Sequence, residues 1–479
     1  MVNIRVGQLK INSGVAFGTS GIRGLVSEMS DTVCAAYTIA FLQTLQLTDT
    51  GQKIALGIDL RPSSPSIARA CAAAIHHAGC EVIYCGALPT PALALFSLTQ
   101  AIPAIMITGS HIPFDRNGIK FYRADGEISK VDELAITESV VDIKSAYDSA
   151  TLPAINHQAI SDYIDRYTRL FDQDFLNGWR IGVYEHSSVA RDCIKNILVY
   201  FGAEVVSLDR TDIFVPIDTE AVSQEDRLRG EAWANQYSLD AIISTDGDGD
   251  RPLIADETGT WLRGDIVGLL CAKFLGVDTV VTPVSCNTAV ELSDAFKQVI
   301  RTRIGSPYVI AGMELISQGS VAGFEANGGF LAGNNLKLAN GKTLSPLPTR
   351  DAVLPALTIL AMAKQQNLKV SELLLDLPKR FTASDRIQNF PTLNSKSLLE
   401  SLQNSETAYQ DIWGDQLSSI SSTDTTDGLR LSFNNGEIIH LRPSGNAPEL
   451  RCYAESDSMT RAETLVQLTL NYISNNLDY

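Results

Sequence analysis

The sequence predicts three tandem, related α/β domains with mixed, mainly parallel sheets, followed by a C-terminal α+β domain. Three observations predict this fold class: a recurring strand–helix–strand pattern, apolar strands that end in polar loops, and hairpin patterning near the C-terminus. The predicted domains cover residues 1–155, 156–258, 259–378 and 379–479.

The first observation is an internal repeat. The pattern S-[IV]-A-R-x-C occurs at residues 66–71 and again at 188–193, each time after an apolar strand and before a glycine that opens the next strand. A weaker third copy covers residues 279–303 and includes a predicted helix over Thr288–Phe296. A repeated strand–helix–strand unit favours parallel sheets with right-handed crossovers.

The C-terminal segment follows a different pattern. Leu429–Phe433 and Glu437–Leu441 flank an Asn-Gly pair, which predicts a β-hairpin. A strand over Glu449–Tyr453 and a helix from about Thr460 to Asn475 complete the predicted α+β domain.

The composition excludes several classes of function. With 38 Lys and Arg against 55 Asp and Glu, the net charge of −17 argues against nucleic-acid binding through the overall field. The eight cysteines form no CxxC pair, which predicts buried thiols in a reducing compartment. We expect a cytoplasmic protein without a signal peptide or membrane span, because the N-terminus lacks an apolar run and the most apolar stretch, 352–363, is too short.

The first candidate loop follows the apolar strand Ala104–Ile107. It reads T-G-S-H-I-P and places Ser110 beside His111, and its final Pro113 cannot continue a hydrogen-bonded ladder. Because open α/β sheets bind ligands at the carboxyl ends of strands, the Ser110 hydroxyl is a candidate for chemistry. Taken alone, the segment favours an ordinary turn, and it lacks the G-x-S-x-G pattern of serine hydrolases.

The second loop follows an apolar strand over residues 239–245 and reads D-G-D-G-D-R. The alternation places Asp246, Asp248 and Asp250 on one side of a tight loop, where like charges repel unless a cation binds. Oxygen ligands favour Mg²⁺ or Ca²⁺, and an EF-hand is rejected because Arg251 stands where that loop requires glycine. Three carboxylates leave Mg²⁺ short of six ligands, so we expect a phosphate to supply another.

The third loop ends a strand over residues 320–324 and reads E-A-N-G-G. Glu325 and Asn327 offer the carboxylate and amide that hold sugar hydroxyls, although a plain glycine turn explains this short pattern equally well.

The fourth loop, R-P-S-G-N, begins at Arg442. This loop offers the paired N–H donors of arginine, a hydroxyl and a glycine-centred group of backbone N–H donors. Such a set of donors is suited to binding a phosphate dianion. The candidate phosphate ligands are Arg442, Ser444, Gly445, Asn446 and Arg451.

The order of these loops resembles the α-D-phosphohexomutase family. The motifs that carry the resemblance are FGTSGIRG at 17–24, T-G-S-H-I-P at 108–113 with N-G-I-K at 117–120, DGDGDR at 246–251, F-E-A-N-G-G at 324–329 and RPSG at 442–445. The resemblance covers nearly the whole chain. It implies four domains around a central cleft, with one loop from each domain.

The resemblance also implies a mechanism. Ser110 would be a phosphoserine that exchanges its phosphoryl group with a hexose phosphate through a bisphosphorylated sugar. Mg²⁺ would be held by the Ser110 phosphate together with Asp246, Asp248 and Asp250, and hexose 1,6-bisphosphate would be an activator. The remaining family roles fall on His111 and Lys120 for proton transfer, Arg23 and Arg251 beside the phosphoserine, Glu325 and Asn327 for the sugar, and Arg442, Ser444, Gly445 and Asn446 for the distal phosphate.

Several positions depart from the family pattern. They are Gly109 and Ile112 where many members have Ala and Asn, Asn327 where Ser is common, Asn446 and Ala447 where Thr and Glu are common, and Arg303 where some members carry a substrate-binding Lys. These departures bear on the choice of substrate rather than on the class of reaction.

We therefore predict an intramolecular phosphotransferase that interconverts hexose 6-phosphate and hexose 1-phosphate, with mannose as the first choice of sugar. The alternatives are a phosphoglucomutase or dual-specificity enzyme, a phosphoglucosamine mutase and, from a different class, a non-catalytic sugar-phosphate-binding protein. We expect small-molecule hexose phosphates as partners, no nucleic acid, no membrane, and a monomer or homodimer.

Overall fold

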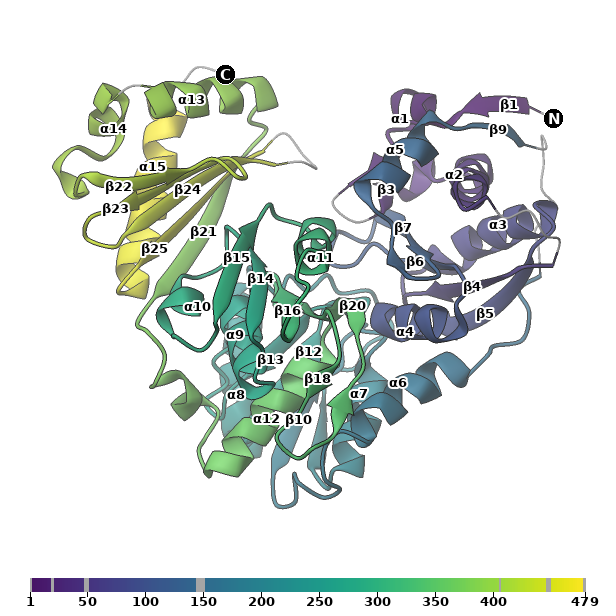
Figure 1. Ribbon diagram of the computed structural model, residues 1–479, viewed down its shortest axis with the longest axis horizontal. Helices are drawn as coiled ribbons and strands as arrows, with labels where there is room; N and C mark the ends of the chain where they lie inside the picture. The colour runs from purple at the N-terminus through teal and green to yellow at the C-terminus, as the bar shows by residue number, and fades with distance from the viewer. Residues whose placement is uncertain are drawn as a thin grey trace.

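The chain forms four units in series, each built around one β-sheet (Figure 1). The computed structural model describes residues 2–18, 21–46, 51–143, 151–404, 406–444 and 449–476. We call the units I to IV; their sheets lie within residues 16–127, 180–255, 279–351 and 381–456. The boundaries at residues 155, 258 and 378 stay predictions.

Unit I has a mixed sheet with the strand order β2-β3-β7-β6-β4-β5, and β8 pairs with β7. Strands β4, β5 and β6 are mutually parallel, whereas β7, β3 and β2 extend the sheet in antiparallel fashion. The elements are β1 (Val2–Arg5), α1 (Val6–Ser13), β2 (Ala16–Phe17), β3 (Ile22–Leu25), α2 (Asp31–Thr44), β4 (Lys53–Ile58), α3 (Ser64–His77), β5 (Glu81–Ala87), α4 (Thr90–Gln100), β6 (Ala104–Ile107), β7 (Arg116–Arg123), β8 (Gly126–Glu127), α5 (Lys130–Glu138) and β9 (Val140–Ile143).

Units II and III repeat the parallel part of this sheet. The elements of unit II are α6 (Gln158–Thr168), β10 (Arg180–Tyr184), α7 (Arg191–Tyr200), β11 (Glu204–Leu208), α8 (Gln224–Tyr237), β12 (Ala241–Thr245) and β13 (Pro252–Ala255). Those of unit III are α9 (Gly264–Phe274), β14 (Thr279–Pro283), α10 (Ala289–Leu292), β15 (Gln298–Thr302), α11 (Ser306–Glu314), β16 (Val321–Phe324), β17 (Phe330–Ala332), β18 (Leu336–Lys337), β19 (Thr343–Leu344), β20 (Leu347–Asp351) and α12 (Val353–Gln366).

The predicted repeat is present in all three sheets. In each, the first strand lies between the second and the third and runs parallel to both, giving β5-β4-β6, β11-β10-β12 and β15-β14-β16. The chain then turns back into an antiparallel strand, namely β7, β13 or β17. The Ser110 loop, the Asp246–Asp250 loop and the Glu325 loop are these three turns, so the repeat gives them equivalent places at their sheets.

One predicted helix is wrong in extent. The segment Thr288–Phe296 contains only the four-residue helix α10. Asp294 has a φ of 51°, in the left-handed region, which ends the helix before the chain enters β15.

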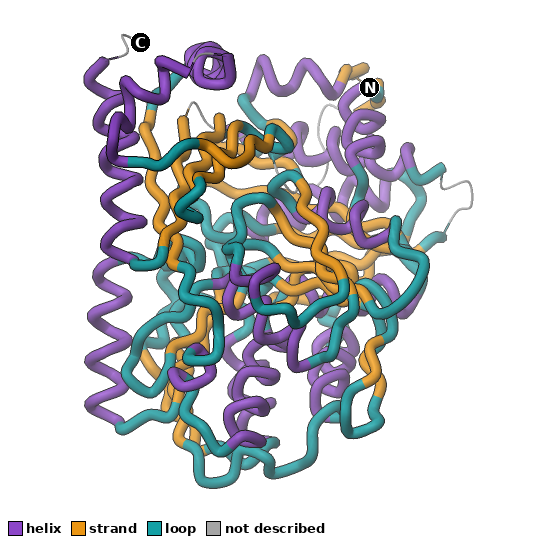
Figure 2. The backbone as a smooth tube through the Cα atoms, turned by 60° about the vertical axis from the view of Figure 1, so that its left-hand side comes forward, coloured by secondary structure: helices purple, strands orange, loops and turns teal. Residues whose placement is uncertain are grey.

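Unit IV is an antiparallel sheet with the order β21-β25-β24-β23-β22, and the long helix α15 runs beside it (Figure 2). The predicted hairpin is formed by β23 and β24, and the predicted C-terminal strand and helix are β25 and α15. The elements are β21 (Phe381–Gln388), α13 (Thr392–Asn404), α14 (Glu406–Trp413), β22 (Ile420–Asp424), β23 (Leu429–Phe433), β24 (Ile438–Pro443), β25 (Glu449–Ser456) and α15 (Met459–Asn476).

The hydrophobic cores do not follow the sheets one by one. A single continuous core joins units I, II and III, and it includes Leu93 on α4, Tyr163 on α6 and Leu357 on α12. Unit IV has a core of its own around Trp413 and Leu431. All eight cysteines are buried and free, as predicted. None of the helices in the described part of the chain has the length and apolar character needed to span a membrane.

Candidate active site

Ser110 lies at the carboxyl end of β6, in the turn that leads back into β7. Its side chain is fully buried, and its φ of 53° is in the left-handed region, a conformation that costs about 1–2 kcal/mol for a residue with a Cβ. The backbone N–H of Ser110 donates to Thr108 Oγ1 at 2.8 Å. The hydroxyl donates to Asp246 Oδ2 at 2.6 Å, which joins the loops of units I and II.

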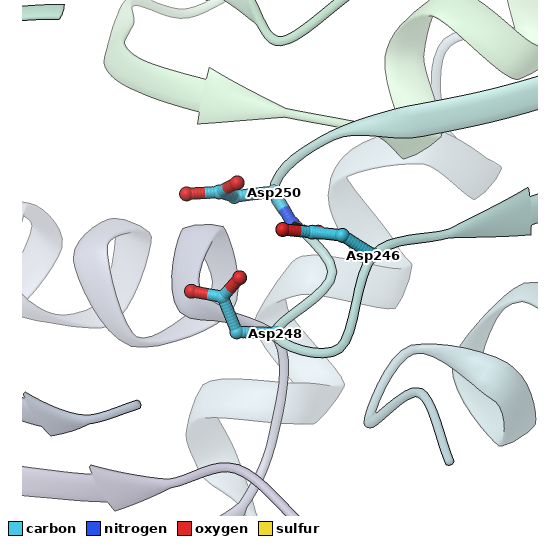
Figure 3. A group of neighbouring side chains, drawn as sticks. All are labelled: Asp246, Asp248 and Asp250. Carbon is cyan, nitrogen blue, oxygen red and sulfur yellow. Dashed lines mark hydrogen bonds between the residues drawn. The ribbon is translucent and has the colours of Figure 1, made fainter. Parts of the chain in front are cut away.

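The three aspartates of the unit II loop form the predicted carboxylate cluster (Figure 3). Asp246, Asp248 and Asp250 are buried, and each offers an oxygen within 4.8 Å of the others. Burial, followed by the charges of the other two carboxylates, raises the pKa of Asp246 well above its usual value. Among the described residues, Asp248 Oδ1 and Asp250 Oδ1 receive no hydrogen bond. Two buried oxygens without donors, in a set of oxygen ligands, fit a divalent cation.

Lys120 binds the other oxygens of two of these carboxylates. Its ammonium lies 2.7 Å from both Asp248 Oδ2 and Asp250 Oδ2, and Thr90 Oγ1 also donates to Asp248 Oδ2 at 2.7 Å. Burial opposes the charge on Lys120, but the two carboxylates outweigh it and raise its pKa. Lys120 is therefore a charged group that leaves the Oδ1 atoms of both aspartates available.

His111 is held in its neutral form next to Ser110. Its Nδ1 lies 3.4 Å from Ser110 Oγ and accepts a hydrogen bond from Arg251 Nη1 at 2.8 Å. Burial, together with the charges of Arg251 and Arg23, lowers the pKa of His111 well below its usual value.

Three guanidinium groups face the same region. Burial and the repulsion of Arg251 and Arg350 lower the pKa of Arg23 to about 10, whereas the charges of Asp248 and Asp250 act in the opposite sense. Cations that repel one another beside a nucleophilic hydroxyl are typical of a site for a multiply charged anion such as a phosphoryl group.

Arg350, on β20 of unit III, was missed by sequence reasoning. Its side chain is buried and donates to Asp250 Oδ2 at 2.9 and 3.1 Å and to Glu325 Oε2 at 3.0 Å. It therefore joins the aspartate loop of unit II to the predicted sugar loop of unit III. Its strand reads L-P-T-R-D, and this local sequence does not identify the partners of the arginine.

The predicted sugar loop is ordered by its own side chains. Glu325 is buried against Arg350, and Asn327 Oδ1 accepts a hydrogen bond from the backbone N–H of Gly329 at 3.0 Å. Thr219 of unit II donates to the Asn327 carbonyl at 2.9 Å. The loop is therefore fixed from two units.

The predicted phosphate loop forms a separate cluster in unit IV. Arg442 Nε lies 3.0 Å from Asp427 Oδ2, and Arg451 lies beside Glu449 at 3.6 Å. Ser444 is buried, with its backbone N–H donating to the Glu449 carbonyl at 2.8 Å. Gly445 and Asn446 lie outside the described residues.

Arg303, which we predicted to bind substrate, lies between units III and IV. Its Nε donates to the Thr426 carbonyl at 3.0 Å, and the neighbouring Ile304 N–H donates to Asp427 Oδ2 at 2.9 Å. In the described contacts Arg303 therefore joins two units, next to Arg442.

The sequence is similar to known proteins over nearly its whole length. Residues 14–146, 263–381 and 367–470 match the family descriptions "Phosphoglucomutase/phosphomannomutase" for alpha/beta/alpha domain I, alpha/beta/alpha domain III and the C-terminal domain. A phosphomannomutase from Salmonella muenchen is 51% identical over 467 residues, which cover 97% of each chain. A phosphomannomutase from Sinorhizobium fredii is 43% identical over 475 residues, covering 97% of this chain and 100% of that protein.

Among solved structures, a phosphoglucomutase/phosphomannomutase family protein from Burkholderia thailandensis superposes with a TM-score of 0.75. The match covers 96% of this chain and 98% of that one at 18% identity, which is a likeness of fold.

Proposed function

Because the chain belongs to the phosphoglucomutase/phosphomannomutase family, we propose that it interconverts mannose 6-phosphate and mannose 1-phosphate, with Ser110 carrying the phosphoryl group. The observation that carries this proposal is the buried Ser110 hydroxyl, which lies 2.6 Å from Asp246 in a three-carboxylate cluster. The choice of mannose is supported by two relatives, 51% and 43% identical, that are named phosphomannomutases.

We propose that Mg²⁺ is held by Asp246, Asp248 and Asp250 together with an oxygen of phosphorylated Ser110. The two donor-free Oδ1 atoms and the oxygen-only ligand set support this assignment. When bound, the ion neutralises charge on the phosphoryl group during its transfer.

In the first transfer, the bond from phosphorus to Ser110 Oγ breaks as a bond from phosphorus to the sugar hydroxyl oxygen forms. His111, held neutral, accepts the proton of that hydroxyl, and Lys120, held charged, donates a proton toward Ser110 Oγ. Arg23 and Arg251 stabilise the negative charge that spreads over the phosphoryl oxygens. The second transfer reverses these roles at the other end of the sugar.

The rest of the substrate is assigned to units III and IV. Glu325 and Asn327 would bind sugar hydroxyls, and Arg442, Ser444, Gly445, Asn446 and Arg451 would bind the phosphate that is not being transferred. Arg303 would complete this phosphate site from the adjoining edge of unit III, where it contacts unit IV.

A two-transfer cycle releases a bisphosphorylated sugar whenever the intermediate escapes, and the enzyme is then left without its phosphoryl group. We therefore propose hexose 1,6-bisphosphate as the activator that restores phosphorylated Ser110. A monomeric or homodimeric state and a cytoplasmic location stay predictions.

The experiment that tests the proposal is a substrate panel. The ratio kcat/KM is compared for mannose 1-phosphate, glucose 1-phosphate and glucosamine 1-phosphate, with Mg²⁺ and a trace of hexose 1,6-bisphosphate. We expect the highest value for mannose 1-phosphate, and incorporation of one phosphoryl group per chain measured by intact mass.

The control is Ser110→Ala, which should bind mannose 6-phosphate but neither turn over nor gain mass. A higher value for glucose 1-phosphate or for glucosamine 1-phosphate would overturn the choice of sugar. An inactive wild-type chain that binds sugar phosphate without incorporating a phosphoryl group would instead indicate a non-catalytic binding protein.

A further inference from the structure

Arg61 is the most completely enclosed cation near the site, and the mechanism above does not use it. It follows β4 of unit I, and its side chain has no exposed surface. Its guanidinium donates to four backbone carbonyls, three in the turn between β6 and β7 and one at the first residue of β7. They belong to Ser110 at 2.9 Å, Ile112 at 2.5 Å, Pro113 at 2.7 Å and Arg116 at 2.9 Å.

Asp59 also binds the turn and pairs with Arg61. Its Oδ2 lies 3.3 Å from Arg61 Nε and accepts the backbone N–H of Gly109, also at 3.3 Å. Its Oδ1 accepts the hydroxyl of Ser64 and the backbone N–H of Arg61. The pair therefore holds the carbonyl of Ser110 and the N–H of the residue before it, on either side of the strained backbone at Ser110.

The turn has no room for a larger residue before Ser110. A Cβ on Gly109 would lie 2.6 Å from Arg61 Cζ and 2.7 Å from Arg61 Nε. Glycine at this position, where many family members have alanine, therefore allows the guanidinium its present place.

A ring from unit II covers the other face of Arg61. The centroid of Phe214, in the segment between β11 and α8, lies 3.9 Å from Arg61 Cζ. Phe214 also packs on the aspartate loop, because a Cβ on Gly247 would lie 3.0 Å from the ring and 3.0 Å from the Ser110 carbonyl. The ring therefore lies between Arg61, which holds the Ser110 turn, and Gly247 of the aspartate loop.

We propose that Arg61 is a positioning residue for phosphoryl transfer: it holds the Ser110 turn and, through Phe214 of unit II, sets that turn against the Asp246–Asp250 loop. The inference rests on the proposed role of Ser110. The described contacts of Arg61 are backbone carbonyls, Asp59 and one ring, so it acts on the placement of Oγ and not on the sugar.

The test is Arg61→Lys, which keeps the buried charge but cannot reach four diverging carbonyls. Dephosphorylated enzyme is mixed with glucose 1,6-bisphosphate and Mg²⁺, and phosphoryl incorporation on Ser110 is followed by intact mass in a single turnover. We expect the rate to fall about 100-fold, the effect of displacing a reacting group by roughly 1 Å. The Kd of mannose 6-phosphate, measured by calorimetry, should change by no more than about threefold, because ground-state binding is untouched.

The matched control is Arg301→Lys in unit III. Arg301 also donates to three loop carbonyls, those of Pro283, Cys286 and Asn287, and pairs with Glu291, but its loop carries no proposed site residue. We expect its incorporation rate to equal that of the wild type. An equal loss in the two lysine variants would assign Arg61 a general role in stability and overturn the proposal.

Phe214→Leu provides a second variant that retains an apolar core side chain. It should fold and lower the incorporation rate by at least about tenfold, by letting the guanidinium and the aspartate loop shift. Wild-type incorporation in folded Arg61→Lys, or in Phe214→Leu when Arg61→Lys does not fold, would overturn the inference. A wild-type chain that incorporates no phosphoryl group would instead overturn the proposed function.

Discussion

Arg350→Met removes a cation that binds buried carboxylates of two units. Arg350 is the buried partner of Asp250 and Glu325, and these three side chains have exposed fractions of 3%, 1% and 5%. Methionine fills a similar volume but leaves two buried carboxylates without this guanidinium. Removing one member of a buried ion pair costs about 3–5 kcal/mol. At about 2 °C per kcal/mol for a large cooperative unit, the melting temperature should fall by about 6–10 °C.

The assay is thermal unfolding with and without Mg²⁺. Because Arg350 competes with a metal for the charge of Asp250, we expect Mg²⁺ to raise the melting temperature more in Arg350→Met than in the wild type. The control is Arg169→Met at the end of α6, whose exposed pair with Asp165 contributes at most about 1 kcal/mol. A fall no larger than in the control, with an unchanged response to Mg²⁺, would refute the assigned role of Arg350.

Three further predictions concern single side chains. Asp248→Asn should raise the Mg²⁺ concentration for half-maximal activity by at least about tenfold, because loss of a residue that only hydrogen-bonds a metal ligand already lowers metal affinity by about this factor. An unchanged metal titration would disprove the ligand role. Arg442→Ala should raise KM for hexose phosphate more than it lowers kcat, because a phosphate clamp binds the ground and transition states alike, and a defect in kcat alone would contradict this. Burial lowers the pKa of His440 to about 4, although its hydrogen bond to the Asp427 carbonyl opposes this shift. Between about pH 6.5 and pH 4, His440 is therefore protonated in the unfolded chain but not in the folded one. Stability should therefore fall as the pH drops from about 6.5 to about 4, by up to about 3 kcal/mol, and urea unfolding of His440→Gln should show a flatter pH dependence.

Local sequence patterns predicted the loops but not the roles of Arg350 and Arg61, two cations that join them. The Asp246–Asp250 loop could be recognised because three carboxylates in five residues need a cation, and the internal repeat placed it at a strand end like the Ser110 loop. Arg350 reaches Asp250 across 100 residues of sequence, and no local pattern encodes such a pairing. Arg61 likewise reads as part of an ordinary strand-end turn.

The predictions were least complete where units meet. Arg303 was assigned to substrate from its place in the chain, and its contact with the Thr426 carbonyl depends on how unit IV sits against unit III. The helix over Thr288–Phe296 stops early because Asp294 takes a left-handed conformation, which apolar periodicity does not reveal.

The continuous core of units I to III also constrains how the chain can be made. Leu93 and Leu357 belong to that one core, yet the ribosome adds the second long after the first. At about 5–20 residues per second, the intervening chain takes on the order of 10–50 s to synthesise. Ribosome-bound chains that end before α12 should therefore be cleaved by protease around α4 and α6, and chains in which α12 has emerged should be protected. During that interval, apolar side chains of this core are exposed to solvent on the nascent chain. We therefore expect the yield in the cell to depend on the rate of translation and on chaperones that bind this surface.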